Sequence, residues 1–529
     1  MLLLETQNSS YDSKNSDQNI HAILQSRFGL KTFRKGQLDI IKSVLNRKDA
    51  LAVMPTGGGK SLCYQLPAVF FNNLVIVISP LIALMKDQVR LLNSIGIAAG
   101  HVHSGQSLAE KRKVFSDMNK GGAFVLYLSP ERVQKPGFVD WIKKQNVSLF
   151  AIDEAHCVSQ WGPDFREDFH KLGLLRKMKP DVPILALTAT ATPAVLKDVG
   201  YQLRLQKPDR HIHGFYRPNL FYQVETCLDD DYKFRFLKNA ISKTPEGRIL
   251  IYCGTRQNAE TIAEQLSESF LGVGFYHAGL GAETRKEIQE KFDRNEMRIL
   301  TATNAFGMGI DYPNVRLVVH YQMPANIESF YQEMGRAGRD GVMSRCLLLY
   351  SKKDKGLQSY FIQQSQAAHD VIQRRWDCLN AMTQFAESHE CRHEGILTYF
   401  KDSERINSCG HCDVCAPTAI WVVEKPTLLS RGTFKEKSKL KKSSLPKKRN
   451  SFEIENSEAE ARKILLKDWR REYAKEHDMP TFIVFSDRTL IDLANKNPST
   501  LDELGTVFGF GPAKTELLGP IILQQLGHS

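Results

Sequence analysis

Short apolar runs alternate with longer amphipathic stretches from about residue 21 to residue 350, and this alternation restricts the chain to few folds. Apolar strands separated by helical segments are typical of parallel sheets with helices on both faces. One such core rarely exceeds about 250–300 residues, so the pattern predicts two α/β domains, at 21–210 and 211–350. Strands are expected at 74–79, 124–129, 148–153, 184–188, 248–253, 274–277, 299–303 and 315–321.

The rest of the chain divides into four segments by composition. Residues 1–20 are rich in Ser, Asn, Asp and Gln, which predicts a disordered leader. Residues 351–420 combine helical patterns with a cysteine cluster, and 456–529 show the periodicity of a small all-α domain. The stretch between them, 421–455, contains a basic run that cannot bury a core, and it is predicted to be a linker.

Lysine and arginine outnumber the acidic residues by 71 to 59, so the chain has a net charge of +12. Such an excess indicates a polyanionic partner such as nucleic acid or an acidic membrane surface. Most of it is local, because 425–450 contains ten Lys/Arg and one Glu. No apolar run approaches the roughly 20 residues of a membrane-spanning helix. No secretory signal is recognised, so the cysteines are expected in a reducing compartment.

A glycine-rich segment that follows the apolar run 50–53 has the composition of a phosphate-binding loop. Glycines let backbone N–H groups close around phosphate oxygens at the start of a helix. Lys60 would neutralise the β- and γ-phosphates of a nucleotide, and Ser61 would ligate Mg²⁺. Met54 stands where the strict motif has its first glycine, and a plain glycine-rich turn is the alternative. The candidate nucleotide-binding residues here are Thr56, Gly57, Gly58, Gly59, Lys60 and Ser61.

The expected strand 148–153 leads into the sequence Asp-Glu-Ala-His, with the candidate catalytic residues Asp153, Glu154 and His156. At the carboxyl end of a parallel strand, Asp153 would hold Mg²⁺ through water and Glu154 would polarise the attacking water. A helix N-cap is the alternative role for the acidic pair. Together with the glycine-rich segment, the pair predicts an ATPase.

Two arginines in the second expected domain, Arg336 and Arg339, are candidates for the positive charge that ATP hydrolysis needs. Their spacing of three residues predicts that they share one helical face. A second domain brings such charge to the γ-phosphate only when the two domains close. A basic surface turn is the alternative interpretation.

Four cysteines have the spacing of a tetrahedral metal site. Structural zinc is the first choice, because tight Cys-x2-Cys turns suit a closed shell of four sulfur atoms. An iron-sulfur cluster is the rival. His393 and His411 are near enough to substitute as ligands, although four cysteines make this unnecessary. The candidate metal ligands are Cys391, Cys409, Cys412 and Cys415.

Over residues 25–415 these motifs resemble, in order, those of superfamily-two helicases, and within them the RecQ family of DNA helicases. The resemblance implies two RecA-like domains around one ATP. Gln37, together with Arg34, looks like the family's adenine-recognition motif. Arg339 falls on the family's arginine finger and Arg336 on a neighbouring phosphate contact.

The segment 159–166, which follows the Asp-Glu-Ala-His sequence, resembles the aromatic-rich loop that distinguishes RecQ enzymes from RNA helicases. Trp161 and Phe165 on this loop would stack on unpaired bases, with Arg166 as a further DNA contact. Core packing of the two rings is the alternative. Pro163 departs from the family, which usually has histidine there, and proline removes both an N–H and an imidazole.

The C-terminal part of the chain also resembles the family, with one omission. The cysteine cluster resembles the RecQ zinc domain, which favours zinc, and 456–529 resembles the HRDC domain, where Lys514 would approach a phosphate backbone. RecQ enzymes usually carry a winged helix of roughly a hundred residues after the zinc site. Only about forty residues follow Cys415 before the next domain, so a winged helix cannot fit. The basic run then either binds DNA by counterion release or serves as a solvated spacer.

The expected fold is therefore α/β: two RecA-like parallel-sheet domains, then a helical zinc-binding subdomain and a small all-α HRDC domain. The resemblance implies a monomeric DNA helicase that depends on ATP, Mg²⁺ and Zn²⁺ and moves 3′ to 5′. It would act in repair and recombination on single-stranded and forked DNA, with single-strand-binding and repair proteins as partners and no membrane. Its location would be the bacterial cytoplasm at the nucleoid, or the eukaryotic nucleus. The alternatives are an RNA helicase and an ATP-regulated DNA-binding or annealing protein with little unwinding.

Overall fold

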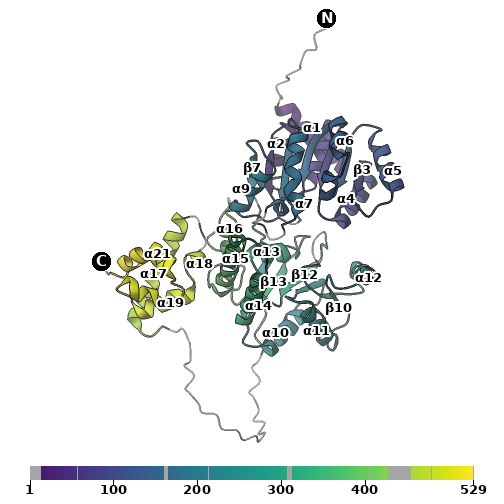
Figure 1. Cartoon of the computed structure of the whole chain (residues 1–529). Helices are drawn as coiled ribbons and strands as arrows, with labels where there is room; N and C mark the ends of the chain where they lie inside the picture. Colours follow the sequence, from purple (N-terminus) through teal and green to yellow (C-terminus); the bar gives the residue numbers. More distant parts are fainter. Residues whose placement is uncertain are drawn as a thin grey trace.

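Two parallel sheets, a helical subdomain and a small helical domain follow one another along the chain (Figure 1). The order confirms the expected fold class. Most of the expected basic linker and the first twelve residues are not among the residues that the structure describes. The computed structural model describes residues 13–55, 57–159, 162, 165–212, 214–306, 312–402, 404–426, 454–477, 479 and 481–527.

The first sheet has seven parallel strands in the order β3-β4-β2-β5-β6-β1-β7. Its five central strands are buried along their whole length, because helices cover both faces. The strands are β1 (Ala50–Val53), β2 (Leu74–Ile78), β3 (Ala98–Val102), β4 (Phe124–Leu128), β5 (Val147–Ile152), β6 (Ile184–Thr188) and β7 (Asp209–Ile212). The α-helices are α1 (Ser13–Phe28), α2 (Gln37–Leu45), α3 (Leu62–Phe71), α4 (Ile82–Ser94), α5 (Leu108–Met118), α6 (Phe138–Lys144), α7 (Glu167–His170), α8 (Leu174–Met178) and α9 (Pro193–Gln202). Short 3₁₀ turns are η1 (Pro130–Gln134), η2 (Ala155–Val158) and η3 (Lys171–Gly173).

The second sheet has six parallel strands in the order β10-β11-β9-β12-β13-β8. Its strands are β8 (Leu220–Thr226), β9 (Arg248–Tyr252), β10 (Val273–Tyr276), β11 (Ile299–Ala302), β12 (Val315–His320) and β13 (Ser344–Tyr350). Its helices are α10 (Asp230–Ser242), α11 (Arg256–Ser267), α12 (Ala282–Asp293) and α13 (Ile327–Met334). The helices that follow are α14 (Lys352–Gln363), α15 (His369–Glu387), α16 (Arg392–Tyr399), α17 (Ser457–Glu476), α18 (Thr481–Val484), α19 (Asp487–Lys496), α20 (Leu501–Gly505) and α21 (Pro512–Gln525).

Three expected boundaries differ from the structure. Residues 13–20 of the expected leader belong to α1, whose Ile20 and Leu24 are buried against the first sheet's helices. Ile20 and Leu24 lie one helical turn apart among polar residues, so the composition of the segment did not indicate a buried helix. Strand β7 pairs with β1, so the first sheet extends past residue 210. Residues 421–424 of the expected linker pack on the second sheet, where Val423 is buried and its backbone bonds the Gln223 side chain.

The C-terminal helical domain docks beside α15, at the end that leads to the cysteine cluster (Figure 1). The contact is built on Arg470, whose side chain is fully buried. Arg470 donates to Asp487 Oδ1 at 2.7 Å within its own domain and lies 3.4 Å from Glu390 Oε1 across the interface. Arg471 approaches the other oxygen of Glu390, also at 3.4 Å. The N–H of His389 donates to Asp487 at 2.9 Å, so one charged cluster joins the two parts.

A Glu390→Ala change is expected to loosen this docking while leaving the C-terminal domain folded. Arg470 keeps Asp487 and the Phe485 carbonyl as partners, so only the contacts of Glu390 with Arg470 and Arg471 across the interface are lost. The loss of a charge-assisted contact of this kind amounts to about 2 kcal/mol. Hydrogen exchange of residues 388–390 and of α18 would measure it, with exposed Glu472 of α17 changed to Ala as the control. Unchanged protection in Glu390→Ala would show that the cluster does not hold the domain.

Candidate functional site

The candidate catalytic residues of the first domain lie at one edge of its sheet, where the carboxyl ends of the parallel strands meet. The order β5-β6-β1 places three loops side by side. β1 leads into the glycine-rich loop, β6 into the segment 188–192, and β5 into Asp153 and Glu154. Residues separated by about a hundred positions are thereby brought to one site.

The glycine-rich loop has the backbone geometry of an anion-binding turn. Gly57 and Gly59 have φ values of 81° and 78°, in the left-handed region that favours glycine. A Cβ on Gly58 would lie 2.9 Å from the Pro55 carbonyl oxygen, so a side chain is excluded there. Lys60, which precedes α3, donates to the Met54 carbonyl at 3.3 Å. The loop, Lys60 and Ser61 at the N-cap of α3 can therefore receive phosphate oxygens; Thr56 lies outside the described residues.

Gln37 and Arg34, expected to recognise adenine, are hydrogen-bonded to the glycine-rich loop. Gln37 is buried, and its amide donates to the carbonyls of Gly59 at 2.9 Å and Gly58 at 3.3 Å. Its Oε1 accepts from the Arg34 N–H at 2.7 Å, and the Arg34 guanidinium donates to the Gly57 carbonyl. A base that engages this amide would compete with the loop for it. Base binding and loop geometry are thus physically linked.

The acidic pair is suited to a divalent cation. Asp153 is 5% exposed, and burial together with the Glu154 charge raises its pKa to about 7, against the effect of Lys60. Glu154 has a φ of 50°, a strained conformation for a non-glycine residue. Its Oε2 is buried without a hydrogen-bond donor and lies 3.4 Å from His156 Nδ1. Carboxylate and hydroxyl oxygens such as those of Asp153 and Ser61 are the kind of donor that Mg²⁺ prefers, so these residues fit this ion by their chemistry.

His156 connects the acidic pair to the segment after β6. Its Nδ1 lies 2.8 Å from Thr188 Oγ1, and the Thr188 hydroxyl donates to the Thr190 carbonyl at 3.0 Å. Two residues on, Thr192 Oγ1 accepts from the Arg374 guanidinium of α15 at 3.2 Å. Hydrogen bonds and the short backbone stretch 188–192 therefore link His156, beside the acidic pair, to α15 of the helical subdomain.

Arg336 and Arg339 do not share a helical face, contrary to the prediction. Helix α13 ends at Met334, and both arginines lie in the turn that follows, where Gly338 has a φ of 55°. A Cβ placed on Gly57 would lie 3.5 Å from Arg339 Cγ. The side chain of Arg339 therefore rests against the glycine-rich loop of the other domain. Arg336 is buried within its own domain.

The turn with the two arginines is held by a residue that the sequence did not single out. Arg217, just before β8, donates to the carbonyls of Ala337 and Gly338, both at 3.0 Å. Asn219 adds a bond from its amide to Gly338 at 2.8 Å. An arginine between two domains has no distinctive pattern in sequence, because its partners lie about 120 residues further on.

The second sheet has a cavity at the carboxyl ends of β9, β11 and β12. It measures about 230 Å³ and is lined by backbone and polar side chains, including Gly254, Thr303, Asn304, Gln322 and Arg336. Apart from Arg336, none of these residues was predicted from the sequence to belong to a site. The available signal was the rule already applied to Asp153, namely that polar residues directly after buried strands meet at one edge.

The candidate DNA contacts occupy two separate places. Phe165 is 38% exposed and packs edge-on against His170, while Arg166 donates to the Pro80 carbonyl at 3.4 Å. Arg166 is thus tied to the segment after β2, whereas Trp161 lies outside the described residues. Lys514 lies in the C-terminal domain, half-buried near the start of α21, and burial lowers its pKa to about 8. Such a lysine attracts phosphate less than a fully exposed one.

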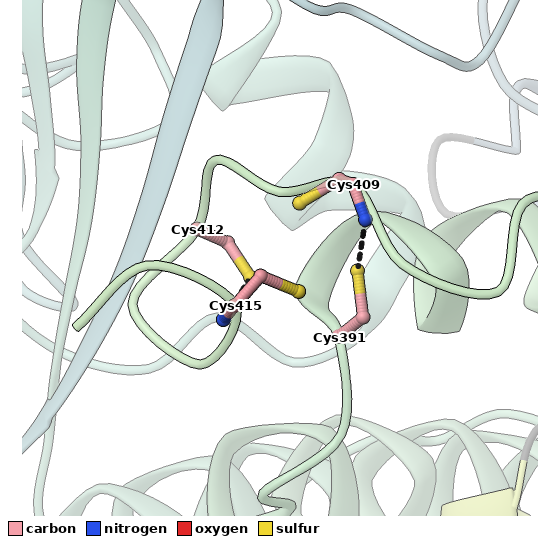
Figure 2. Close-up of side chains that lie close together, drawn as sticks. All are labelled: Cys391, Cys409, Cys412 and Cys415. Carbon is pink, nitrogen blue, oxygen red and sulfur yellow. Dashed lines mark hydrogen bonds between the residues drawn. The ribbon is translucent and has the colours of Figure 1, made fainter. Parts of the chain in front are cut away.

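The four predicted cysteines converge on one point (Figure 2). Their sulfur atoms lie within 4.8 Å of one another. The Cys409 N–H donates to Cys391 Sγ at 3.3 Å, and the Cys415 N–H donates to Cys412 Sγ at 3.4 Å. Backbone N–H groups that donate to the sulfurs favour the thiolate form that a metal needs. Four converging thiols fit a closed tetrahedral zinc site.

The cysteine loop is fastened to the edge of the second sheet. Arg392 donates to both carboxylate oxygens of Asp413, at 2.9 and 3.2 Å. The N–H of Asp413 donates to the Tyr222 carbonyl, and its carboxylate accepts from the Val224 N–H, both at 2.9 Å. The loop therefore caps β8, which would otherwise be a bare edge strand.

Four family models match successive parts of the chain: DEAD/DEAH box helicase at 34–199, helicase conserved C-terminal domain at 232–341, RecQ zinc-binding at 352–416 and HRDC domain at 462–526. In the described part of the chain, no helix is long and apolar enough to cross a membrane. The match at 352–416 contains all four cysteines and makes this segment a zinc-binding domain.

Curated relatives match most of the chain. The ATP-dependent DNA helicase RecQ of Bacillus subtilis is 34% identical over 96% of this chain and 98% of its own length. The protein of the same name from Haemophilus influenzae is 42% identical over 74% of this chain and 63% of its own length. The Bacillus alignment spans 583 positions, 54 more than this chain has residues, so that relative has at least 54 residues without a counterpart here.

Among solved structures, a Dbp5 variant from Saccharomyces cerevisiae bound to a Gle1 variant matches 66% of this chain and 94% of its own. Its TM-score is 0.50 at 18% identity, which supports the shared fold of the two sheet domains. The matched families and the full-length Bacillus relative agree with the order of motifs in the sequence and with their convergence in the structure. The chain belongs to the RecQ family of ATP-dependent DNA helicases.

Proposed function

We propose that the chain hydrolyses ATP in the cleft between its two sheets and uses each cycle to move 3′ to 5′ along single-stranded DNA. The contact of Arg339 with Gly57 supports this most directly. It puts the phosphate loop of one domain and an arginine of the other within reach of the same nucleotide. Opening and closing of the two domains would then ratchet the strand.

In this proposal the glycine-rich loop and Lys60 bind the β- and γ-phosphates, and Gln37 and Arg34 bind the adenine base. Arg339 stabilises the negative charge that develops on the γ-phosphate, with Arg336 as a neighbouring phosphate contact. Closure is required because Arg339 belongs to the other domain. Arg217 would act as a positioning residue, since it donates to the carbonyls of the turn that carries Arg336 and Arg339.

Ser61 and Asp153 would hold Mg²⁺, which neutralises phosphate charge when bound. Glu154 orients and polarises the attacking water, and its strained backbone keeps the carboxylate at this position. His156 passes the state of the nucleotide site to Thr188. From there the path through Thr192 reaches α15.

Single-stranded DNA would cross the carboxyl ends of both sheets. Phe165 and Trp161 stack on bases, Arg166 lies beside them, and the cavity near Thr303 receives the backbone of the strand. Lys514 would add a weaker contact from the HRDC domain. We propose that the protein acts as a monomer on forked DNA in repair and recombination, with single-strand-binding and repair proteins, at the nucleoid or in a nucleus.

A Lys60→Ala variant is expected to lose strand displacement and at least a hundredfold of its ATP hydrolysis, because the β/γ-phosphate charge is no longer neutralised. Strand displacement on a forked duplex and phosphate release would be measured together. Lys48→Ala, which removes an exposed lysine of the same domain, is the control and should behave as wild type. Equal unwinding by Lys60→Ala and wild type would contradict the proposed ATP mechanism.

An ATP-regulated DNA-binding or annealing protein is the second candidate. It is motivated by the connection after Cys415, which is too short for a winged helix, and by the 54 or more residues that the Bacillus relative has in addition. ATP-stimulated translocation without separation of a forked duplex would favour this candidate. Unwinding that depends on Lys60 would favour the helicase.

Deletion of 425–450 is expected to weaken the salt dependence of DNA binding. The segment carries ten basic residues and one acidic residue, and each phosphate that it neutralises adds about 0.7–0.9 to the slope of log K against log salt. Most of the segment lies outside the described residues, so the prediction rests on charge. Replacement by a neutral Gly/Ser linker of equal length is the matched control for tether length. An unchanged slope in both variants would reduce the segment to a spacer.

A further inference from the structure

Two histidines lie against the four-cysteine cluster and take no part in it. His393 in α16 and His411 between Cys409 and Cys412 have ring centroids 4.6 Å apart. One ring nitrogen of each histidine and the Cys409 sulfur lie within 4.8 Å of one another. The two histidines and Cys409 form a second set of potential metal ligands, which has Cys409 in common with the four-cysteine cluster.

Hydrogen bonds determine which ring nitrogens carry protons. His393 Nε2 lies 3.2 Å from the Arg217 carbonyl, and His411 Nδ1 lies 2.5 Å from the Cys409 carbonyl. A carbonyl oxygen only accepts, so each of these nitrogens must donate an N–H. In the neutral rings, His393 Nδ1 and His411 Nε2 therefore carry lone pairs.

Both lone-pair nitrogens are buried and have no hydrogen-bond partner, and His393 as a whole is 2% exposed. A buried acceptor left unsatisfied is unfavourable unless something binds it. Metal-ligating histidines show this arrangement: one ring nitrogen donates to a carbonyl and the other faces the ion. The rings of Tyr216 and Tyr222 pack edge-on against His393 and fix its orientation.

We propose that His393, His411 and Cys409 form a second metal site, for Zn²⁺, beside the four-cysteine zinc. Two imidazoles and one thiolate suit this borderline-soft ion and disfavour hard Mg²⁺. The Cys409 thiolate has lone pairs enough to bridge the two ions. With three protein ligands the second ion keeps an open position, so it exchanges more easily than the enclosed one. The site lies one hydrogen bond from Arg217, which holds the turn of Arg336 and Arg339.

Metal counting on the full-length protein tests the proposal. Protein treated with a chelating resin to leave only its tight zinc would be titrated with Zn²⁺, and bound zinc measured by atomic emission. Wild type is expected to take up one further equivalent. His411→Gln, a half-buried position, is expected to keep the tight zinc and bind the further equivalent at least tenfold more weakly.

His389→Gln is the matched control, because this histidine is exposed, lies two residues before Cys391 and is outside both donor sets. It should take up the further equivalent as wild type does. In cadmium-loaded protein, cadmium NMR should show two resonances in wild type and one in His411→Gln. Three results would overturn the proposal: saturation of wild type at one ion, loss of the tight zinc from His411→Gln, or equal losses in His389→Gln and His411→Gln.

Discussion

An Arg339→Ala variant is expected to lose about a thousandfold in kcat for DNA-stimulated ATP hydrolysis, which corresponds to about 4 kcal/mol of transition-state stabilisation. The side chain lies against Gly57 of the phosphate loop, and in the proposed mechanism its charge acts on the γ-phosphate. An arginine finger acts on the transition state more than on the bound nucleotide. KM for ATP should therefore change little, whereas Lys60→Ala should also weaken nucleotide binding.

Steady-state kinetics with saturating single-stranded DNA would separate kcat from KM. Arg316→Ala is the matched control, because Arg316 pairs with Asp340 near the same turn. It is expected to retain most of the activity. Arg339→Lys restores the charge without the planar fork and should recover only part of the rate. A kcat for Arg339→Ala within a few-fold of wild type would remove Arg339 from the chemistry.

Loss of zinc is expected to unfold the segment that carries the cysteines and to inactivate the enzyme. Structural zinc sites in small domains bind with apparent free energies of about 10–16 kcal/mol, most of which is folding free energy. Cys412 is fully buried at the centre of the cluster, so Cys412→Ser should lose the ion. The loop that caps β8 through Asp413 would then detach from the second sheet.

The effect should extend to the ATP site through the segment before β8. Phe215 donates its N–H to Asp402 at 2.9 Å and stacks on Phe400 at 4.3 Å, and Arg217 follows two residues later. Zinc content, protease sensitivity of 392–426 and ATP hydrolysis would be measured on the same sample. Cys378→Ser, in α15 and outside the cluster, is the control. Full zinc content in Cys412→Ser would contradict the proposed ligand set.

Much of the fold could be predicted from short windows of sequence. The eight expected strands are present, because a strand buried on both faces needs a continuous apolar run. Five strands, β1, β3, β7, β8 and β13, were not among those expected. Of these, β3, β7 and β8 lie at sheet edges, and β3 and β7 include exposed or polar positions such as Arg210. The prediction of a disordered leader was wrong for residues 13–20. The composition there is polar, but two buried side chains, Ile20 and Leu24, suffice to dock the helix on the first domain.

The residues of the candidate site also fall into two groups, those predicted from local sequence patterns and those whose position depends on the tertiary structure. Lys60, Asp153 and the four cysteines were predicted from residue type and spacing, because phosphate loops, strand-end carboxylates and zinc turns are local patterns. The position of Arg339 against Gly57 could not be obtained this way, since it depends on how two domains face each other. The same holds for Gln37, whose amide is bonded to a loop twenty residues away.

The sequence alone therefore predicted the chemistry of this protein: the residue types and spacings expected to bind phosphate, a divalent cation and zinc, and their order along the chain. Only the tertiary structure decided which residues act on one another. Arg336 and Arg339 lie in a turn after α13 and not on a helical face, and Arg217 holds that turn. The hydrogen bonds of His393 and His411 leave one ring nitrogen of each with a lone pair. Spacing along the chain fixes contacts within a few residues, whereas contacts across a hundred or more depend on sheet order and on domain packing.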